Sequence, residues 1–180
     1  TGNKVTTYNH LKKLNDNIID IYTDYKKINK DLPIVSKLID GLGSEKLYIF
    51  KNREDLENNK NKISEKHFFQ RYHEGEVVGI NIIANKNKLK ILSINQQIYN
   101  FIFTNEIILD QIHFGKYNNM INMFSSFVDK IMKNFNGYYG FFGIDAILTT
   151  DKKILFLEIN PRLTTSYAGL SKTLGFNPIK

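Results

Sequence analysis

Two acidic residues stand at matching positions in two apolar, strand-like runs near the end of the chain. If the turn between the runs is centred on Asp151 and Lys152, residues whose numbers sum to 303 pair with each other. Asp145 and Glu158 are such a pair, so we expect their β-carbons about 4.5–5.5 Å apart. Asn160 lies two residues further along, on the same face. Facing like charges repel unless something neutralises them, and hard divalent cations such as Mg²⁺ take oxygen ligands of this kind. The pattern predicts a divalent-metal site formed by Asp145, Glu158 and Asn160.

A second interpretation places both acids on an ordinary solvated face of the hairpin. The apolar flanks argue against it, because Asp145 and Glu158 interrupt runs that otherwise favour burial. A buried carboxylate needs a partner or a metal. Arg162 follows within four residues of Glu158, and a guanidinium can hold a phosphate group through paired hydrogen bonds. These residues together favour a site for a metal and a phosphate group.

A glycine-bearing loop with a lysine before it forms a second candidate site. Lys37 precedes a loop that contains Asp40, Gly41, Gly43 and Ser44. Glycine lets backbone N–H groups approach phosphate oxygens, and the lysine adds a positive charge. The spacing is neither that of a P-loop nor that of a dinucleotide fingerprint. Taken alone, the loop is therefore more typical of a plain hairpin turn.

A polar strand end forms a third candidate site. Gln70, Arg71 and Tyr72 close a short strand-like run, and Glu76 follows after a glycine-containing turn. Such a strand end can present backbone groups to an adenine edge, and a carboxylate can accept hydrogen bonds from ribose hydroxyls. Taken alone, the segment is a strand end and a turn. The four histidines show no spacing typical of metal ligands.

Composition limits the class of protein. The chain has 180 residues, of which 42% are hydrophobic and 24% charged, which indicates one domain or two small lobes with a real core. The absence of Cys excludes disulfides and thiolate chemistry and favours a cytoplasmic protein. No apolar stretch approaches the about 18 residues of a membrane span. The net charge of +7 suits an anionic nucleotide, and because the lysines are scattered we do not expect a nucleic-acid partner.

Hydrophobic periodicity predicts several strands in meanders and a few helices. Besides the hairpin that holds the two acids, we expect strands at 32–39, 47–50, 67–72, 77–84, 89–99 and within 101–114. We expect helices at 16–30, 52–59, 117–135 and 164–174, the third being the most clearly amphipathic. Strands that follow one another without alternating helices indicate an α+β fold.

The candidate sites occur in an order that resembles the ATP-grasp superfamily over nearly the whole chain. The matching positions are Lys4, Lys37 with the loop 40–44, Gln70 to Glu76, Asp145 and the run 158–162. The resemblance implies a two-lobed ATP-grasp fold of antiparallel sheets with helices, with ATP between the lobes. It also implies a carboxylate–amine ligase that releases ADP and forms an amide through an acyl phosphate. The run 158–167 is most similar to an archaeal branch, which implies glutamate and tyramine as substrates and a role in methanofuran biosynthesis.

The resemblance also implies a role for each matched residue. Lys4 and Lys37 would hold the α- and β-phosphates, and the loop 40–44 would form a flap over them. The segment 70–72 would bind adenine, and Glu76 would bind ribose. The three predicted metal ligands would hold two Mg²⁺ or Mn²⁺ ions. Lys37 and Arg162 would be catalytic, with Arg162 stabilising the γ-phosphoryl group in transit.

Two positions depart from the superfamily pattern. Leu38 follows Lys37 where many relatives have Pro, and Gln70 stands where Glu is common at the adenine hinge. An amide oxygen can still accept a hydrogen bond from the exocyclic amine of adenine.

We expect a helical segment at 1–30, a small lobe with the flap at 31–75 and a large lobe with the metal hairpin at 76–180. Superfamily members usually carry another α/β domain before these lobes, and we expect this chain to lack it. Two alternatives stay open, a non-catalytic ATP-binding module and an ATP-grasp ligase for another amino acid or amine.

Overall fold

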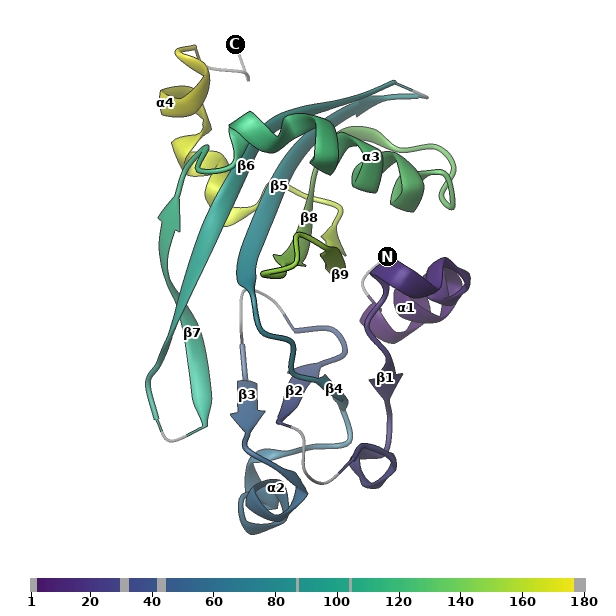
Figure 1. Cartoon of the computed structure of the whole chain (residues 1–180), viewed down its shortest axis with the longest axis vertical. Helices are drawn as coiled ribbons and strands as arrows, with labels where there is room; N and C mark the ends of the chain where they lie inside the picture. The colour runs from purple at the N-terminus through teal and green to yellow at the C-terminus, as the bar shows by residue number, and fades with distance from the viewer. Residues whose placement is uncertain (1–2, 30–32, 42–44, 87, 104, 177–180) are drawn as a thin grey trace.

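The computed structural model describes residues 3–29, 33–41, 45–86, 88–103 and 105–176 (Figure 1). The α-helices are α1 (Lys4–Leu11), α2 (Arg53–Asn58), α3 (Ile121–Met132) and α4 (Leu170–Leu174). The strands are β1 (Ile21–Tyr22), β2 (Ile34–Leu38), β3 (Leu47–Phe50), β4 (His67–Arg71), β5 (Glu76–Asn85), β6 (Lys88–Phe101), β7 (Glu106–His113), β8 (Tyr139–Leu148) and β9 (Ile154–Asn160). Of the helices in the described ranges, none combines the length and the hydropathy that a membrane span requires.

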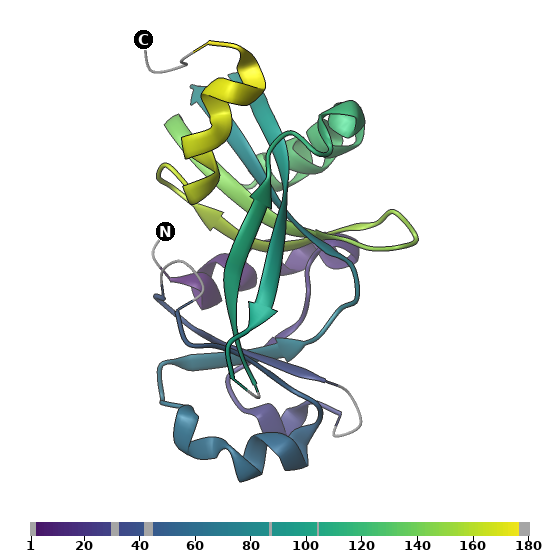
Figure 2. The ribbon, with the colours of Figure 1, turned by 90° about the vertical axis from the view of Figure 1, so that its left-hand side faces the viewer.

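The strands form one antiparallel sheet in the order β1-β4-β2-β3-β7-β6-β5-β8-β9, which confirms the predicted α+β class. In Figure 1, β2, β3, β4 and α2 make up the lower lobe, and β5, β6, β8, β9 and α3 the upper lobe. The long β6–β7 hairpin runs from the upper lobe down to the lower one (Figure 2). It joins the lobes because β7 pairs with β3, where Leu47 lies opposite Ile107 and Tyr48 opposite Glu106.

Each lobe has its own hydrophobic core. The larger core lies between the upper sheet and the helices α1 and α3, and its fully buried residues include Leu11, Phe124 and Phe156. The smaller core lies between the lower sheet and α2, around Phe50 and Leu56. Because α1 packs in the larger core, the residue at its start, Lys4, is held against the upper lobe.

The helix predicted at 16–30 is wrong. The segment contains a 3₁₀ turn that ends at Asn17, the two-residue strand β1, and a second 3₁₀ turn at Tyr25–Lys27. Ile21 packs against the larger core and Tyr22 against the smaller one, so no single helical face could bury both. Pairing of β1 with β4 supplies the backbone hydrogen bonds in place of a helix.

The predicted helix at 117–135 is present but shorter. The first residues of the predicted helix instead form hydrogen bonds with β6. The Tyr117 backbone N–H donates to the Ile94 carbonyl at 3.1 Å, and the Asn118 side chain accepts from the Ile94 N–H at 2.8 Å. The last predicted helix divides into a 3₁₀ turn at Thr165–Gly169 followed by α4. It ends as predicted at Gly175, whose φ of 72° is left-handed.

We predict that Phe124→Ala lowers the free energy of unfolding by about 3–5 kcal/mol, because the fully buried ring would leave a cavity under α3. Chemical denaturation followed by circular dichroism measures the change. Ile121→Ala on the same helix is the control, because its side chain is 42% exposed. Equal losses for the two variants would contradict the assigned packing face of α3.

Candidate functional site

The predicted pairing of Asp145 with Glu158 is confirmed, although the strands reach it by a different register. Near the turn, the sequence numbers of paired residues sum to 302, as for Leu148 and Ile154. The centre of the turn is therefore half a residue from the predicted one. Between Phe156 and Glu158 the register shifts by one residue, and beyond the shift the sum is 303. Without that shift, Asp145 would face Leu157 in place of Glu158.

The extra residue is a β-bulge at Leu157. Phe156 and Ile159 on either side point into the larger core. Leu157 and Glu158 both line the same small cavity between the lobes, as expected when a bulge turns two successive side chains toward one face. The bulge therefore presents an apolar and an acidic side chain together to the cleft.

The Asp145 carboxylate is held by two side-chain amides. Gln97 Nε2 donates to Asp145 Oδ1 at 2.9 Å, and Asn160 Nδ2 donates to Asp145 Oδ2 at 2.8 Å. Burial raises the pKa of Asp145 to about 7, and the facing Glu158 carboxylate raises it as well, while the two amides and Lys37 oppose the shift. The site is therefore short of positive charge and would gain from a cation.

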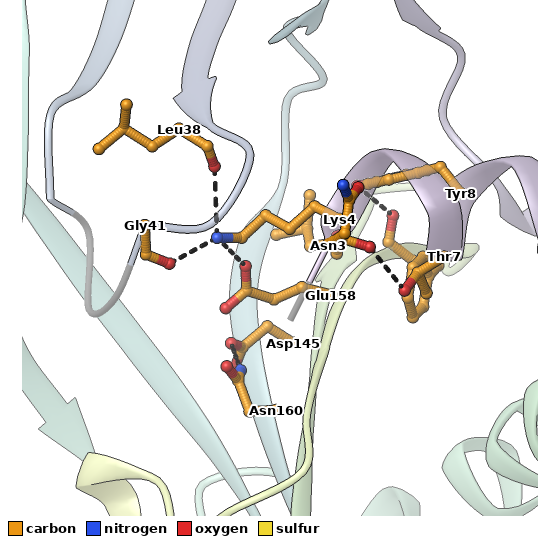
Figure 3. Close-up of polar contacts among 11 residues, drawn as sticks. Asn3, Lys4, Thr7, Tyr8, Leu38, Gly41, Asp145, Glu158 and Asn160 are labelled. Atoms are coloured by element: carbon orange, nitrogen blue, oxygen red, sulfur yellow. Dashed lines mark hydrogen bonds and ion pairs between the residues drawn. The ribbon is translucent and has the colours of Figure 1, made fainter. Parts of the chain in front are cut away.

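Lys4 connects the acidic pair to the glycine-bearing loop (Figure 3). Its Nζ lies 3.5 Å from Glu158 Oε2 and donates to the Gly41 carbonyl at 2.6 Å. Asn3 caps α1 by accepting from the Thr6 N–H at 3.0 Å, which fixes the start of the helix beside the cleft. The helix thus delivers a positive charge next to the acids.

Lys37 lies on β2 and lines both cavities of the cleft. Burial lowers the pKa of Lys37 to about 8; Glu158 and Asp145 act in the opposite direction, and Lys4 lowers it further. An anionic group that entered here would favour the charged amine and restore the usual pKa.

The glycine-bearing loop lies only partly inside the described residues. Gly41 lines the small cavity, and a β-carbon there would lie 2.7 Å from Leu38 Cβ, so any side chain would collide. Asp40 is exposed and is not among the residues that line the cavities. Gly43 and Ser44 lie outside the described residues.

A larger cavity of about 380 Å³ adjoins the small one and extends to the strand end at 70–72. Gln70, Arg71, Tyr72 and Glu76 all line it. Gln70 is 2% exposed, and its Oε1 has no hydrogen-bond partner among the described residues. A buried acceptor without a partner is costly, and a ligand donor in the cavity would satisfy it.

Glu76 is already engaged at both carboxylate oxygens. Gln96 Nε2 donates to Oε1 at 2.9 Å, and the Tyr117 hydroxyl donates to Oε2. A carboxylate has about four lone-pair sites, so each oxygen can still accept from a hydroxyl in the cavity.

Arg162 is not among the residues that line the two cavities. It follows β9, its side chain is exposed, and its Nη1 donates to the Leu163 carbonyl at 3.0 Å. The hydroxyls of Thr164 and Ser166 each donate to Asn81 Oδ1 at 2.9 Å, which ties this loop to β5. These hydroxyls therefore hold the loop against the sheet.

Sequence reasoning missed Gln97 and Tyr99, which line the cleft from β6. The available signal was the run of three polar residues at 95–97 within the strand. That run alone did not indicate that Gln97 contacts Asp145, because the two residues lie on strands separated by β5.

The oxygen atoms at the acidic pair fit a divalent cation. Asp145 and Glu158 supply carboxylates. Asn160 uses its N–H on Asp145, so its amide oxygen is left to face a cation. In the described part of the chain, no three or more His, Cys, Asp or Glu side chains come together in a cluster that could hold a metal ion. The amide of Asn160 would be the third oxygen ligand, as hard cations accept.

The model of the ATP-grasp domain family matches residues 1–166. The chain therefore belongs to the ATP-grasp family. Tyramine–L-glutamate ligases from Methanocaldococcus fervens and Methanocaldococcus jannaschii are each 29% identical to it, over 169 and 125 residues. These matches cover 94% and 69% of this chain and 48% and 38% of the ligases, so the chain spans less than half the length of the curated relatives it matches.

A solved structure supports the fold. The N5-carboxyaminoimidazole synthetase from Staphylococcus aureus complexed with ADP matches with a TM-score of 0.73 at 15% identity. The match covers 93% of this chain and 47% of that chain. The likeness confirms the predicted ATP-grasp fold.

We predict that, in EDTA, Asp145→Asn becomes more stable relative to the native chain as pH rises from about 5 to 7. The folded-state pKa of Asp145, about 7, lies above its ordinary value of 3.8. The folded chain therefore binds the proton more tightly, and the native chain loses stability across this window until both states are ionised. Thermal unfolding at several pH values measures the difference.

Asp151→Asn is the control for this pH series. Asp151 lies in the turn of the same hairpin, and hydrogen bonds from Thr149 and Lys153 lower its pKa, so it should show no trend above pH 5. A parallel pH dependence of the native chain and Asp145→Asn would contradict the assigned burial of Asp145.

Proposed function

We propose that this chain is the ATP- and metal-binding part of a carboxylate–amine ligase that forms an amide through an acyl phosphate. The observation that carries the proposal is the facing pair Asp145 and Glu158 in a cleft that Lys4 and Lys37 also line. Acids and lysines that line one cleft suit a polyphosphate with its metal ions, since each charge then has a partner.

The nucleotide would lie across both cavities. Adenine would occupy the larger cavity, where the partnerless Gln70 oxygen can accept from its exocyclic amine, with the backbone of 71–72 beside the ring. Glu76 would accept from the ribose hydroxyls. The phosphates would then extend into the small cavity toward Lys37 and Lys4, beneath the flap that we assign to residues 40–44.

Asp145, Glu158 and Asn160 would hold two metal ions, either Mg²⁺ or Mn²⁺. When bound, the ions supply positive charge that neutralises the phosphate oxygens. We assign to Arg162 the contact with the γ-phosphoryl group in transit; this role requires its exposed side chain to turn toward the cleft when the nucleotide is bound.

The reaction asks for positioning and charge neutralisation more than for a nucleophilic side chain. A carboxylate oxygen of the substrate attacks the γ-phosphorus, the bond from that phosphorus to the bridging oxygen breaks, and ADP leaves. The amine nitrogen then attacks the carbonyl carbon of the acyl phosphate, phosphate leaves, and the amine gives up a proton. Closure of the flap over the phosphates would keep water from the acyl phosphate.

The proposed substrates are glutamate and tyramine, because both curated relatives carry the name tyramine–L-glutamate ligase. This choice would place the protein in methanofuran biosynthesis, in the cytoplasm. A ligase for another amino acid or amine would use the same nucleotide site, so the substrates are the more specific half of the proposal.

We predict ADP release by the full-length protein with ATP, Mg²⁺ or Mn²⁺, glutamate and tyramine, measured by a coupled assay. Asp145→Ala and Glu158→Ala should each lower the rate at least about 100-fold, because each removes a metal ligand. Asp151→Ala, in the exposed turn of the same hairpin, should leave the rate unchanged. Unchanged rates in both site variants would contradict the metal assignment.

The substrate panel separates the remaining outcomes. ADP release with glutamate and a different amine would support the ligase and reject tyramine. Tight ATP binding without turnover on any carboxylate and amine pair would favour a non-catalytic ATP-binding module.

We predict that Gln70→Leu weakens ATP binding about 10-fold and reduces the preference for ATP over GTP, because the adenine amine loses its acceptor. Isothermal titration with a non-hydrolysable ATP analogue measures the affinity. Gln70→Glu, which keeps an acceptor oxygen at the same place, is the matched control and should bind more tightly than Gln70→Leu. Equal ATP affinities of the native chain and Gln70→Leu would place adenine elsewhere.

A further inference from the structure

Gln97 on β6 contacts a carboxylate that lies two strands away. The strand order is β6-β5-β8, so β5 lies between Gln97 and Asp145. Gln97 Nε2 nevertheless donates to Asp145 Oδ1 at 2.9 Å. Neighbouring strands lie about 4.8 Å apart, so this contact needs a long side chain and open space above the middle strand.

Gly79 supplies the open space. It is the residue of β5 that pairs with Asp145. A β-carbon there would lie 2.5 Å from Gln97 Nε2 and 3.3 Å from Asp145 Oδ1. Its φ is not in the left-handed region, so space and not backbone conformation accounts for the glycine. Any side chain at this position would push the Gln97 amide away from the carboxylate.

The orientation of the Gln97 amide is determined at both ends. The Tyr99 hydroxyl donates to Gln97 Oε1 at 3.0 Å, and the Asp145 carboxylate can accept only from the nitrogen. Asn160 holds the other carboxylate oxygen at 2.8 Å. With one amide donor on each oxygen, the plane of the Asp145 carboxylate is fixed.

We propose that Gln97 is a positioning residue for the metal site, which holds the Asp145 carboxylate in its cation-binding orientation across the open space above Gly79. The inference rests on the proposed function, because it requires Asp145 to be a metal ligand. Partners that hydrogen-bond metal ligands typically change metal affinity by about 10- to 100-fold when they are replaced. Gln97 acts here through Asp145 and need not touch the metal.

Three variants test this role in the full-length protein. Gln97→Met keeps the length and removes the amide. Gln97→Asn keeps the amide but is one methylene too short to cross β5. Gly79→Ala leaves every polar group in place and displaces the Gln97 amide by contact. Each should weaken Mn²⁺ binding in the presence of ADP about 10- to 100-fold, measured by electron paramagnetic resonance of free Mn²⁺.

Two further measurements separate positioning from a structural role. Binding of ADP in EDTA and the thermal unfolding midpoint should stay close to native in Gly79→Ala. Gln111→Met is the matched control, because Gln111 is an exposed glutamine on the neighbouring strand β7 and should leave Mn²⁺ affinity unchanged.

Native Mn²⁺ affinity in both Gln97→Met and Gly79→Ala would overturn the inference. An equal loss of metal-free ADP binding would overturn it too, because the residue would then be structural. If Gln97→Met does not fold, Tyr99→Phe replaces it, because this change removes the hydroxyl that orients the Gln97 amide. Native Mn²⁺ affinity in both Gly79→Ala and Tyr99→Phe would then overturn the inference. If the native protein does not bind Mn²⁺, the proposed metal site is wrong and this inference fails with it. If the native protein binds Mn²⁺ and the variants bind it equally well, only this inference fails.

Discussion

Two carboxylates that face each other in a half-buried cleft are the constraint on which the rest of the site depends. Asp145 and Glu158 are paired by the hairpin itself, so they cannot move apart without breaking the pairing of β8 with β9. Their repulsion and burial make the charged state costly, as the raised pKa of Asp145 indicates. Each surrounding element relieves part of that cost: α1 contributes Lys4, β2 contributes Lys37, and β6 contributes Gln97.

Two connections between the lobes keep the cleft beside the acidic pair. The cleft lies where the lower strands meet β6 and β7, and the β3–β7 pairing makes the sheet continuous across it. One covalent link between the lobes, from β4 to β5, passes through Gly75. This glycine has a φ of 149°, and a β-carbon there would lie 2.6 Å from the Leu148 carbonyl oxygen. Both connections hold the part of the cleft around Gln70 against the acidic hairpin.

Local patterns predicted those features that depend on local physics. The hairpin of β8 and β9 follows from two apolar runs with a turn between them, α3 from a helical stripe of apolar residues, and the Gly175 stop from a left-handed glycine. The pairing of Asp145 with Glu158 was correct because the bulge at Leu157 offset a half-residue error in the turn, and no local pattern indicates that bulge. Even in this hairpin, therefore, part of the agreement came from a feature that the pattern does not contain.

Features that depend on the order of the strands in the sheet could not be predicted from local sequence patterns. The segment 16–30 has helical spacing, yet its side chains divide between two cores that exist only once the sheet is assembled. Gln97 reaches Asp145 across β5 only because β5 carries Gly79 at that point. Thr164 and Ser166 bond to Asn81 on β5, a contact between positions more than 80 residues apart that no local pattern indicates.

The most direct measurement is a crystal structure of the full-length protein with Mn²⁺ and a non-hydrolysable ATP analogue. We expect anomalous density for Mn²⁺ between the phosphates and the oxygens of Asp145, Glu158 and Asn160, with adenine beside Gln70. Nucleotide bound in this cleft with Mn²⁺ that contacts neither Asp145 nor Glu158 would contradict the assignment of the acidic pair as the metal site.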